Sequence, residues 1–191
     1  MTDVTQEDRD AARRAARGDQ LVPGNFRFIT DGARVTEKAN KNGFKQAVAS
    51  AYPLRDPDDA GSADFRVKET LWIALPLENP EIEGHKVDAK TLKDAAGYFN
   101  ALFPERIPFV RKKKEDGTYK TDKEYQEELE GVYLQTRVLA REIVANPSML
   151  DDLFFYGSTT LKTNGNGNWL NNVFPVLTGD RKLTPASEFI A

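Results

Sequence analysis

The chain has 191 residues, of which 39% are hydrophobic and 30% charged, and its formal net charge is −3. It has no cysteine and one histidine, His85, which excludes disulfides, thiolate zinc sites and multi-histidine metal sites. The longest apolar runs, such as 71–77, are too short to span a bilayer, and the charged N-terminus lacks the apolar core of a secretory signal. We therefore expect a cytoplasmic protein that does not bind a membrane. We also expect no cofactor.

The first 19 residues read as a helical arm, with Thr5 as a cap and alanine as the main apolar residue of a helix over 5–17. We expect the main domain at 20–178. Residues 179–191 then form a C-terminal tail, which composition predicts to be loosely ordered.

Two strands are predicted next, over 25–39 and 44–54. In the first, Phe26, Phe28 and Thr30 alternate on even positions, whereas after Asp31-Gly32 the apolar residues fall on odd positions. A slip of one residue at a glycine predicts a β-bulge, which bends a strand as a small barrel requires. In the second strand one face carries Phe44, Val48, Tyr52 and Leu54 and the other carries Ala47, Ala49 and Ala51, and either face could point inward.

A third strand is predicted over 65–77, after a polar loop. Its odd positions carry six apolar residues that should face the core (Phe65, Val67, Leu71, Ile73, Leu75 and Leu77), whereas its even positions include Arg66, Lys68 and Trp72. A helix follows over 88–103, with Asp88 as its cap and Pro104 at its end. Residues 109–121 form either a basic hairpin turning at Asp116-Gly117 or a solvated loop.

Thr121 and Glu124 have the spacing of a capping box and predict the start of a long helix that ends near Asn146-Pro147. Two strands close the chain, over 153–162 and 168–177. The sequence TNGNG joins them, and because a phosphate-binding loop would launch a helix and not a strand, we interpret it as a hairpin turn.

Three strands, a helix and two further strands are the element order of an OB barrel. We therefore predict a mainly β fold with helices: a five-stranded OB-like barrel with a helix between strands 3 and 4 and a helical insertion over about 104–147. Other five-stranded barrels and sandwiches share this order and stay open at this point.

The candidate binding residues are cations beside aromatic rings, because single-stranded nucleic acid needs cations for phosphates and flat rings for bases. Strand three supplies Trp72, Arg66 and Lys68, and the first connecting loop and second strand supply Lys38, Lys41, Lys45, Phe44 and Tyr52. The final hairpin adds Lys162 and Trp169, and a basic cluster adds Arg111, Lys112, Lys113 and Lys114. Each also has a structural interpretation: the long helix could cover Trp72, Trp169 could pack on a strand, and the charges could only be solvated.

Three stretches, PGNFRF, FRVKETLWIAL and TTLKTNGNGNWLNNVFPVL, make residues 20–178 resemble the OB-type single-stranded DNA-binding proteins of bacteriophages. The resemblance implies non-catalytic, largely sequence-independent coating of single-stranded DNA in phage replication, recombination or repair within the bacterial host. It also implies replication or recombination proteins as partners. The chain departs from that pattern in its long helical insertion and in a C-terminus, LTPASEFIA, with only one acidic residue.

Two other classes of function are weighed against this one. A structural or adaptor protein, such as a virion or regulatory component, would use the barrel and the long helix for protein contacts, with a homodimer as one form. A metal-dependent nuclease would need Asp56, Asp58 and Asp59 to hold Mg²⁺, but acidic loops of this kind are usually only solvated, and His85 in a polar turn adds no catalytic signal. We therefore expect no enzyme activity. RNA stays open as an alternative ligand.

Overall fold

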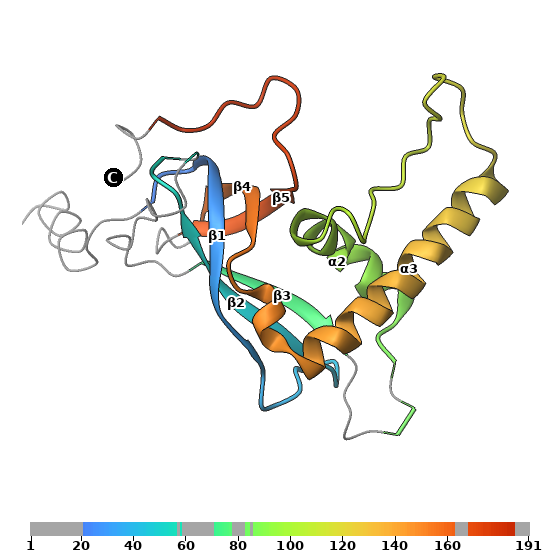
Figure 1. The fold of residues 1–191 in the computed structure, drawn as a ribbon, viewed down its shortest axis with the longest axis horizontal. Coiled ribbons are helices and arrows are strands. Elements are labelled where there is room, and N and C mark those ends of the chain that lie inside the picture. The colour runs from blue at the N-terminus through green and yellow to red at the C-terminus, as the bar shows by residue number, and fades with distance from the viewer. Residues whose placement is uncertain are drawn as a thin grey trace, which may run out of the picture.

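The computed structural model describes residues 21–56, 58, 71–77, 83–84, 86–162 and 168–185. The elements in chain order are β1 (Gly24–Val35), β2 (Lys45–Pro53), β3 (Leu71–Leu77), α2 (Ala89–Leu102), α3 (Asp122–Ala145), the 3₁₀ helix η2 (Pro147–Leu150), β4 (Phe154–Leu161) and β5 (Asn168–Phe174). Figure 1 shows the strands curled together on one side and the helices α2 and α3 on the other.

The five strands form one antiparallel sheet in the order β3-β2-β1-β4-β5. The two outer strands of that order, β3 and β5, also lie close to each other, so the sheet is a nearly closed barrel. This barrel, with α2 between β3 and β4, is consistent with an OB-like architecture. The predicted fold class is confirmed.

The predicted bulge lies in β1. The pairing of β1 with β2 shifts register between Asp31 and Arg34, and Gly32 adopts a positive φ of 67°. Glycine accepts this left-handed conformation without the steric cost of a side chain. The shift changes which residues of β1 face inward: Phe26, Phe28 and Thr30 are buried before the bulge, and Arg34 is exposed after it.

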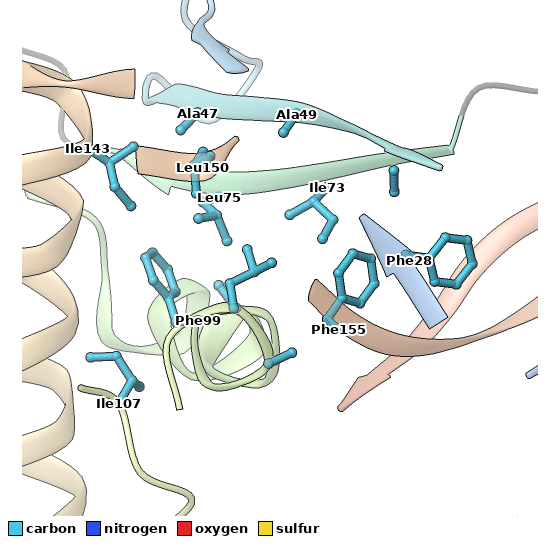
Figure 2. Packing of buried hydrophobic residues seen from close by; sticks show 14 of the residues in the cluster. Phe28, Ala47, Ala49, Ile73, Leu75, Phe99, Ile107, Ile143, Leu150 and Phe155 are labelled. Atoms are coloured by element: carbon cyan, nitrogen blue, oxygen red, sulfur yellow. The ribbon is translucent and has the colours of Figure 1, made fainter. Parts of the chain in front are cut away.

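The alanine face of β2 points into the barrel, which decides the choice that the sequence left open. Ala47, Ala49 and Ala51 are buried, and Figure 2 shows the first two above Ile73 and Leu75 of β3. Larger rings fill the space that these small residues leave. Phe28 of β1 stacks on Phe155 of β4, with ring centroids 5.1 Å apart.

Thr30 joins β1 to the segment before β4. Its buried hydroxyl donates to the Leu150 carbonyl and accepts a hydrogen bond of 3.0 Å from the Leu153 N–H. The Thr30 carbonyl accepts a further bond of 2.9 Å from the Asp152 N–H. Buried polar groups need such partners, so Thr30 fixes where the chain enters the barrel again after α3.

Both helices begin at the predicted caps. The Asp88 carboxylate accepts a bond from the Thr91 N–H, and Thr121 with Glu124 forms a complete capping box. Helix α2 contacts β3, β4 and β5, and α3 packs on α2, β3 and η2. Figure 2 shows Phe99 of α2 and Ile143 of α3 beside Leu75 and Leu150, so the helices extend the barrel core at one side.

Residues 111–120 form a short hairpin, as one of the two alternatives predicted. Lys113 and Tyr119 form a bridge, and Gly117 has a φ of 85°. The final strands pair as a hairpin, but its turn, 163–167, lies outside the described residues, as do the predicted N-terminal arm and the start of the third strand, 65–70.

Part of the C-terminal tail is held against the barrel. The Thr184 N–H donates to the Asn25 carbonyl at 2.9 Å, and the Asn25 side chain donates to the Lys182 carbonyl at 3.1 Å. The expectation of a loosely ordered tail is therefore wrong for these residues, because the first residues of β1 supply backbone partners. Among the helices that are described, none is both long enough and apolar enough to cross a membrane.

Candidate nucleic-acid interface

Trp72 lies on the outer face of β3 and is 45% exposed. The guanidinium carbon of Arg34 lies 4.9 Å from the centroid of its ring. Strand β2 separates β1 from β3, so the two side chains meet across an intervening strand. The alternative in which the long helix covers Trp72 is wrong. This ring is a large flat surface on the outside of the barrel with a cation beside it.

Trp169 occupies a similar position on β5. It pairs with Thr160 of β4, points outward and is 61% exposed. The Lys162 ammonium lies 4.8 Å from its ring centroid. Since β1, β3 and β5 run in the same direction, Trp72 and Trp169 both lie near the strand starts, at the same end of the barrel. We call Arg34, Trp72, Lys162 and Trp169 the tryptophan face.

Further rings on the outer surface also lie beside arginines. Arg27 of β1 lies 4.6 Å from the Phe154 ring centroid and 6.0 Å from that of Tyr156, both on β4. Arg181 lies 4.3 Å from the Phe174 ring on β5. A guanidinium over a ring gains electrostatic attraction from the ring quadrupole. These pairs extend the same combination of cations and rings over β1, β4 and β5.

The sequence interpretation missed these arginines. The signal for Arg27 was its odd position between the inward Phe26 and Phe28, which places it on the outer face. For Arg34 the signal was the bulge, because the same slip that turns Ala33 and Val35 inward turns Arg34 outward. Neither signal identifies the ring that each arginine meets, which depends on strand pairing.

The loop lysines lie at the other end of the barrel from Trp72. Lys45 pairs with Leu77, whereas Ser50 pairs with Trp72, so five residues of β2 separate the two positions. At a rise of 3.3 Å per residue this is about 16 Å. Lys38 and Lys41 are exposed in the loop before β2, beyond Lys45. The structure therefore does not bring these three lysines together with the tryptophan face.

Phe44 is in the core, which corrects the expectation of a ring available to a base. It is 7% exposed and packs with Val87 and Leu92, with Tyr133 beside them. Its ring anchors the loop before β2 to the two helices. Tyr52 is half-buried on the outer face of β2, opposite Ile29, and so lies on the same side of the sheet as Trp72.

The basic cluster lies in a separate arm. Figure 1 shows the connection between α2 and α3, which contains the hairpin, projecting away from the strands together with the first turns of α3. Lys112 lies 5.6 Å from the Tyr125 ring and Lys113 lies 5.2 Å from the Tyr119 ring. Lys114 forms an ion pair with Glu124 at 2.9 Å. Lys113 and Lys114, with Phe109 and Arg111, line an open groove of about 660 Å³ that is remote from the tryptophan face.

The pKa of the Glu124 carboxyl group, which lies in this arm, is strongly lowered. Its carboxylate accepts hydrogen bonds from the Lys114 ammonium and from the Thr121 N–H, which lower its pKa to about 2. Carboxylates also lie on the α3 side of the groove, at Glu124 and Glu128. The groove is therefore less favourable to phosphate than its lysines alone suggest.

Arg66, Lys68 and His85 lie outside the described residues, as does Asp59. Asp56 accepts a bond of 3.0 Å from the Asp58 N–H, as in an ordinary polar turn. Within the described residues, no group of three or more histidine and acidic side chains has the arrangement of a metal site.

Compared with models of known protein families, with curated proteins and with solved structures, the chain shows no match. The function therefore has to be argued from the fold and from the side chains on its surface.

Proposed function

We propose that this protein binds single-stranded DNA without catalysis, largely independently of base sequence, through the tryptophan face. The observation that carries this proposal is that both tryptophans of the chain point outward, are 45% and 61% exposed, and lie beside a cation. Tryptophan is usually highly buried. Two such rings at the same end of a barrel, each with a cation, match the requirement of a single strand for stacking surfaces and phosphate contacts.

In the proposed complex, bases stack on Trp72 and Trp169, and Arg34 and Lys162 move from the rings to neighbouring phosphates or remain stacked beside the bases. The arginine and ring pairs at Arg27 and Arg181 extend the path of the strand across β4 and β5. Such a protein would cover single strands during DNA replication, recombination or repair, which is the role that the sequence pattern led us to expect.

Intrinsic fluorescence tests this proposal directly, because the chain has only two tryptophans and both belong to the proposed interface. We expect a thymine oligomer of about 30 nucleotides to quench the fluorescence to saturation, and we expect affinity to fall with salt as counterions are released. Trp72→Phe and Trp169→Phe assign the quenching to one ring or the other. A flat titration together with no gel shift, for DNA and for an RNA oligomer, would contradict the proposal.

A protein adaptor is the second candidate. Leu134 and Val138 lie one turn apart on α3 and are 65% and 50% exposed, an apolar pair on the solvent side of the helix. A second copy or another protein could cover this pair. Sedimentation with and without oligonucleotide separates the two candidates, since an adaptor that binds no nucleic acid would not shift when DNA is added.

A further inference from the structure

Asp31, Ser50 and Trp72 form one row across three strands. Ser50 of β2 pairs directly with Asp31 of β1 on one side and with Trp72 of β3 on the other. Residues directly opposite each other in an antiparallel pair point to the same face, with Cβ atoms about 5 Å apart. The carboxylate of Asp31 therefore lies on the same outer face as the exposed ring of Trp72.

The Trp72 and Arg34 side chains meet on the outer face of β2. Arg34 comes from β1 yet lies 4.9 Å from the Trp72 ring, so the two side chains meet above the intervening strand. Two outward residues of β2 beneath them, Val48 and Ser50, are only 9% and 7% exposed. A base stacked on Trp72 and extending over β2 would have one edge near β1, the strand that carries Asp31.

The Asp31 carboxylate is exposed and has acceptor capacity left. Its Oδ1 accepts a bond of 2.7 Å from the Gly32 N–H. Within the part of the chain that the structure describes, no cation lies at ion-pair distance from it. A carboxylate accepts hydrogen bonds and donates none, so it attracts an amino group and repels a carbonyl oxygen or a phosphate.

We propose that Asp31 reads the edge of the base that stacks on Trp72 and selects bases with an exocyclic amino group over thymine. Cytosine presents its N4 amino group and adenine its N6 amino group, whereas thymine presents the O4 carbonyl at the equivalent position. The inference rests on the proposed function, because it needs a base on Trp72. It adds a preference at one position to binding that is otherwise independent of sequence.

The test compares two oligomers of about 12 nucleotides, one of thymidine and one of 5-methyldeoxycytidine. The two bases share the ring methyl group and differ at ring positions 3 and 4. We expect the wild-type protein to bind the 5-methylcytosine oligomer about tenfold more tightly, which is the lower part of the range for a good bidentate contact with a base. We expect Asp31→Asn to bind both oligomers equally, because an amide can accept from an amine and donate to a carbonyl. Its Oδ1 can still accept from Gly32, so the bulge is preserved.

Asp180→Asn is the matched control, since Asp180 is an exposed acid after β5 and outside the row. It removes the same charge and should raise the affinity for both oligomers alike while keeping the tenfold ratio. Equal binding of the two oligomers by the wild-type protein would overturn the role of Asp31 and leave the proposed function standing. A preference that survives in Asp31→Asn would also overturn it. If neither oligomer binds the wild-type protein, the proposed function itself fails.

Discussion

Arg34 lies 4.9 Å from the ring of Trp72, although the two residues belong to strands that are not neighbours in the sheet. The bulge between Asp31 and Arg34 makes this contact possible, since it turns Arg34 to the outer face. A bend of β1 that closes the barrel thus also places a cation beside an exposed ring. The fold and the proposed interface depend on the same local distortion.

Trp72→Ala should weaken the binding of a thymine oligomer by about 1–3 kcal/mol, or roughly 5- to 150-fold in Kd, because one stacking surface is lost. Fluorescence anisotropy of a labelled oligomer measures this change. The side chain is 45% exposed, so the midpoint of urea unfolding should move little. Trp72→Phe, which keeps a smaller ring, should bind with intermediate affinity. Unchanged binding by Trp72→Ala would show that the site lies elsewhere.

Removing the cations of the tryptophan face should reduce the salt dependence of binding, whereas removing those of the hairpin should not. Each lost phosphate contact lowers the slope of log K against log salt by about 0.7 for a single strand. We expect the double variant Arg34→Ser and Lys162→Ser to lower the slope of log K against log salt by about 1.4, because two phosphate contacts are lost. The triple variant Arg111→Ser, Lys112→Ser and Lys113→Ser serves as the comparison. A larger loss of salt dependence in the triple variant would show that the interface lies on the arm that carries the hairpin.

Thr30→Val should destabilise the fold by about 1–3 kcal/mol, because it leaves the buried Leu150 carbonyl and Leu153 N–H without their side-chain partner. The substitution keeps the shape of the side chain, so the effect reports on hydrogen bonding. Thr160→Val is the control, an exposed threonine on β4 for which we expect less than about 0.5 kcal/mol. Urea unfolding of both variants measures the difference, and equal stabilities would contradict the role of Thr30.

Replacing each of two glycines with alanine should change the stability of the fold in opposite directions. A Cβ at Gly157 would lie 2.7 Å from Leu170 Cδ1 and 3.1 Å from Phe28 Cε2, so Gly157→Ala should overpack the barrel and cost about 1–3 kcal/mol. A Cβ at Gly131 in α3 would meet nothing within 4 Å, so Gly131→Ala should stabilise by about 0.5–1 kcal/mol. Thermal unfolding of the two variants checks both signs. A stable Gly157→Ala would show that the barrel interior can expand.

The capping box of α3 should lose its contribution to stability in acid. The hydrogen bond from Lys114 and those from Thr121 lower the pKa of Glu124 from 4.5 to about 2. A depressed carboxylate pKa stabilises the fold above the unfolded value and stops doing so as pH falls through the folded value. The gap in urea midpoint between the wild-type protein and Glu124→Gln should therefore be constant above pH 4.5 and narrow toward pH 2. Glu127→Gln, at an exposed position of α3 outside the capping box, is the control variant.

The order and type of the elements followed from local patterns in the sequence. Alternation identified the strands and the inward Phe26 and Phe28, the slip at Gly32 located the bulge, and Thr121 with Glu124 marked the start of α3. These features involve residues close together in the chain, so spacing alone determines them. The hairpin of β4 and β5 was predictable for the same reason.

The arrangement of the candidate site could not be predicted in the same way, because it depends on strand register and on the direction of a helix. Only the pairing of β1, β2 and β3 places Arg34 and Asp31 in the neighbourhood of Trp72. From the sequence alone, Lys113 is as strong a candidate for a phosphate contact as Lys162. Helix α3 has 24 residues and is about 36 Å long, and its far end holds the hairpin away from the barrel. The sequence by itself determined which side chains could bind, through composition and periodicity, whereas the tertiary structure decided which of them lie together, through contacts between residues far apart in the chain.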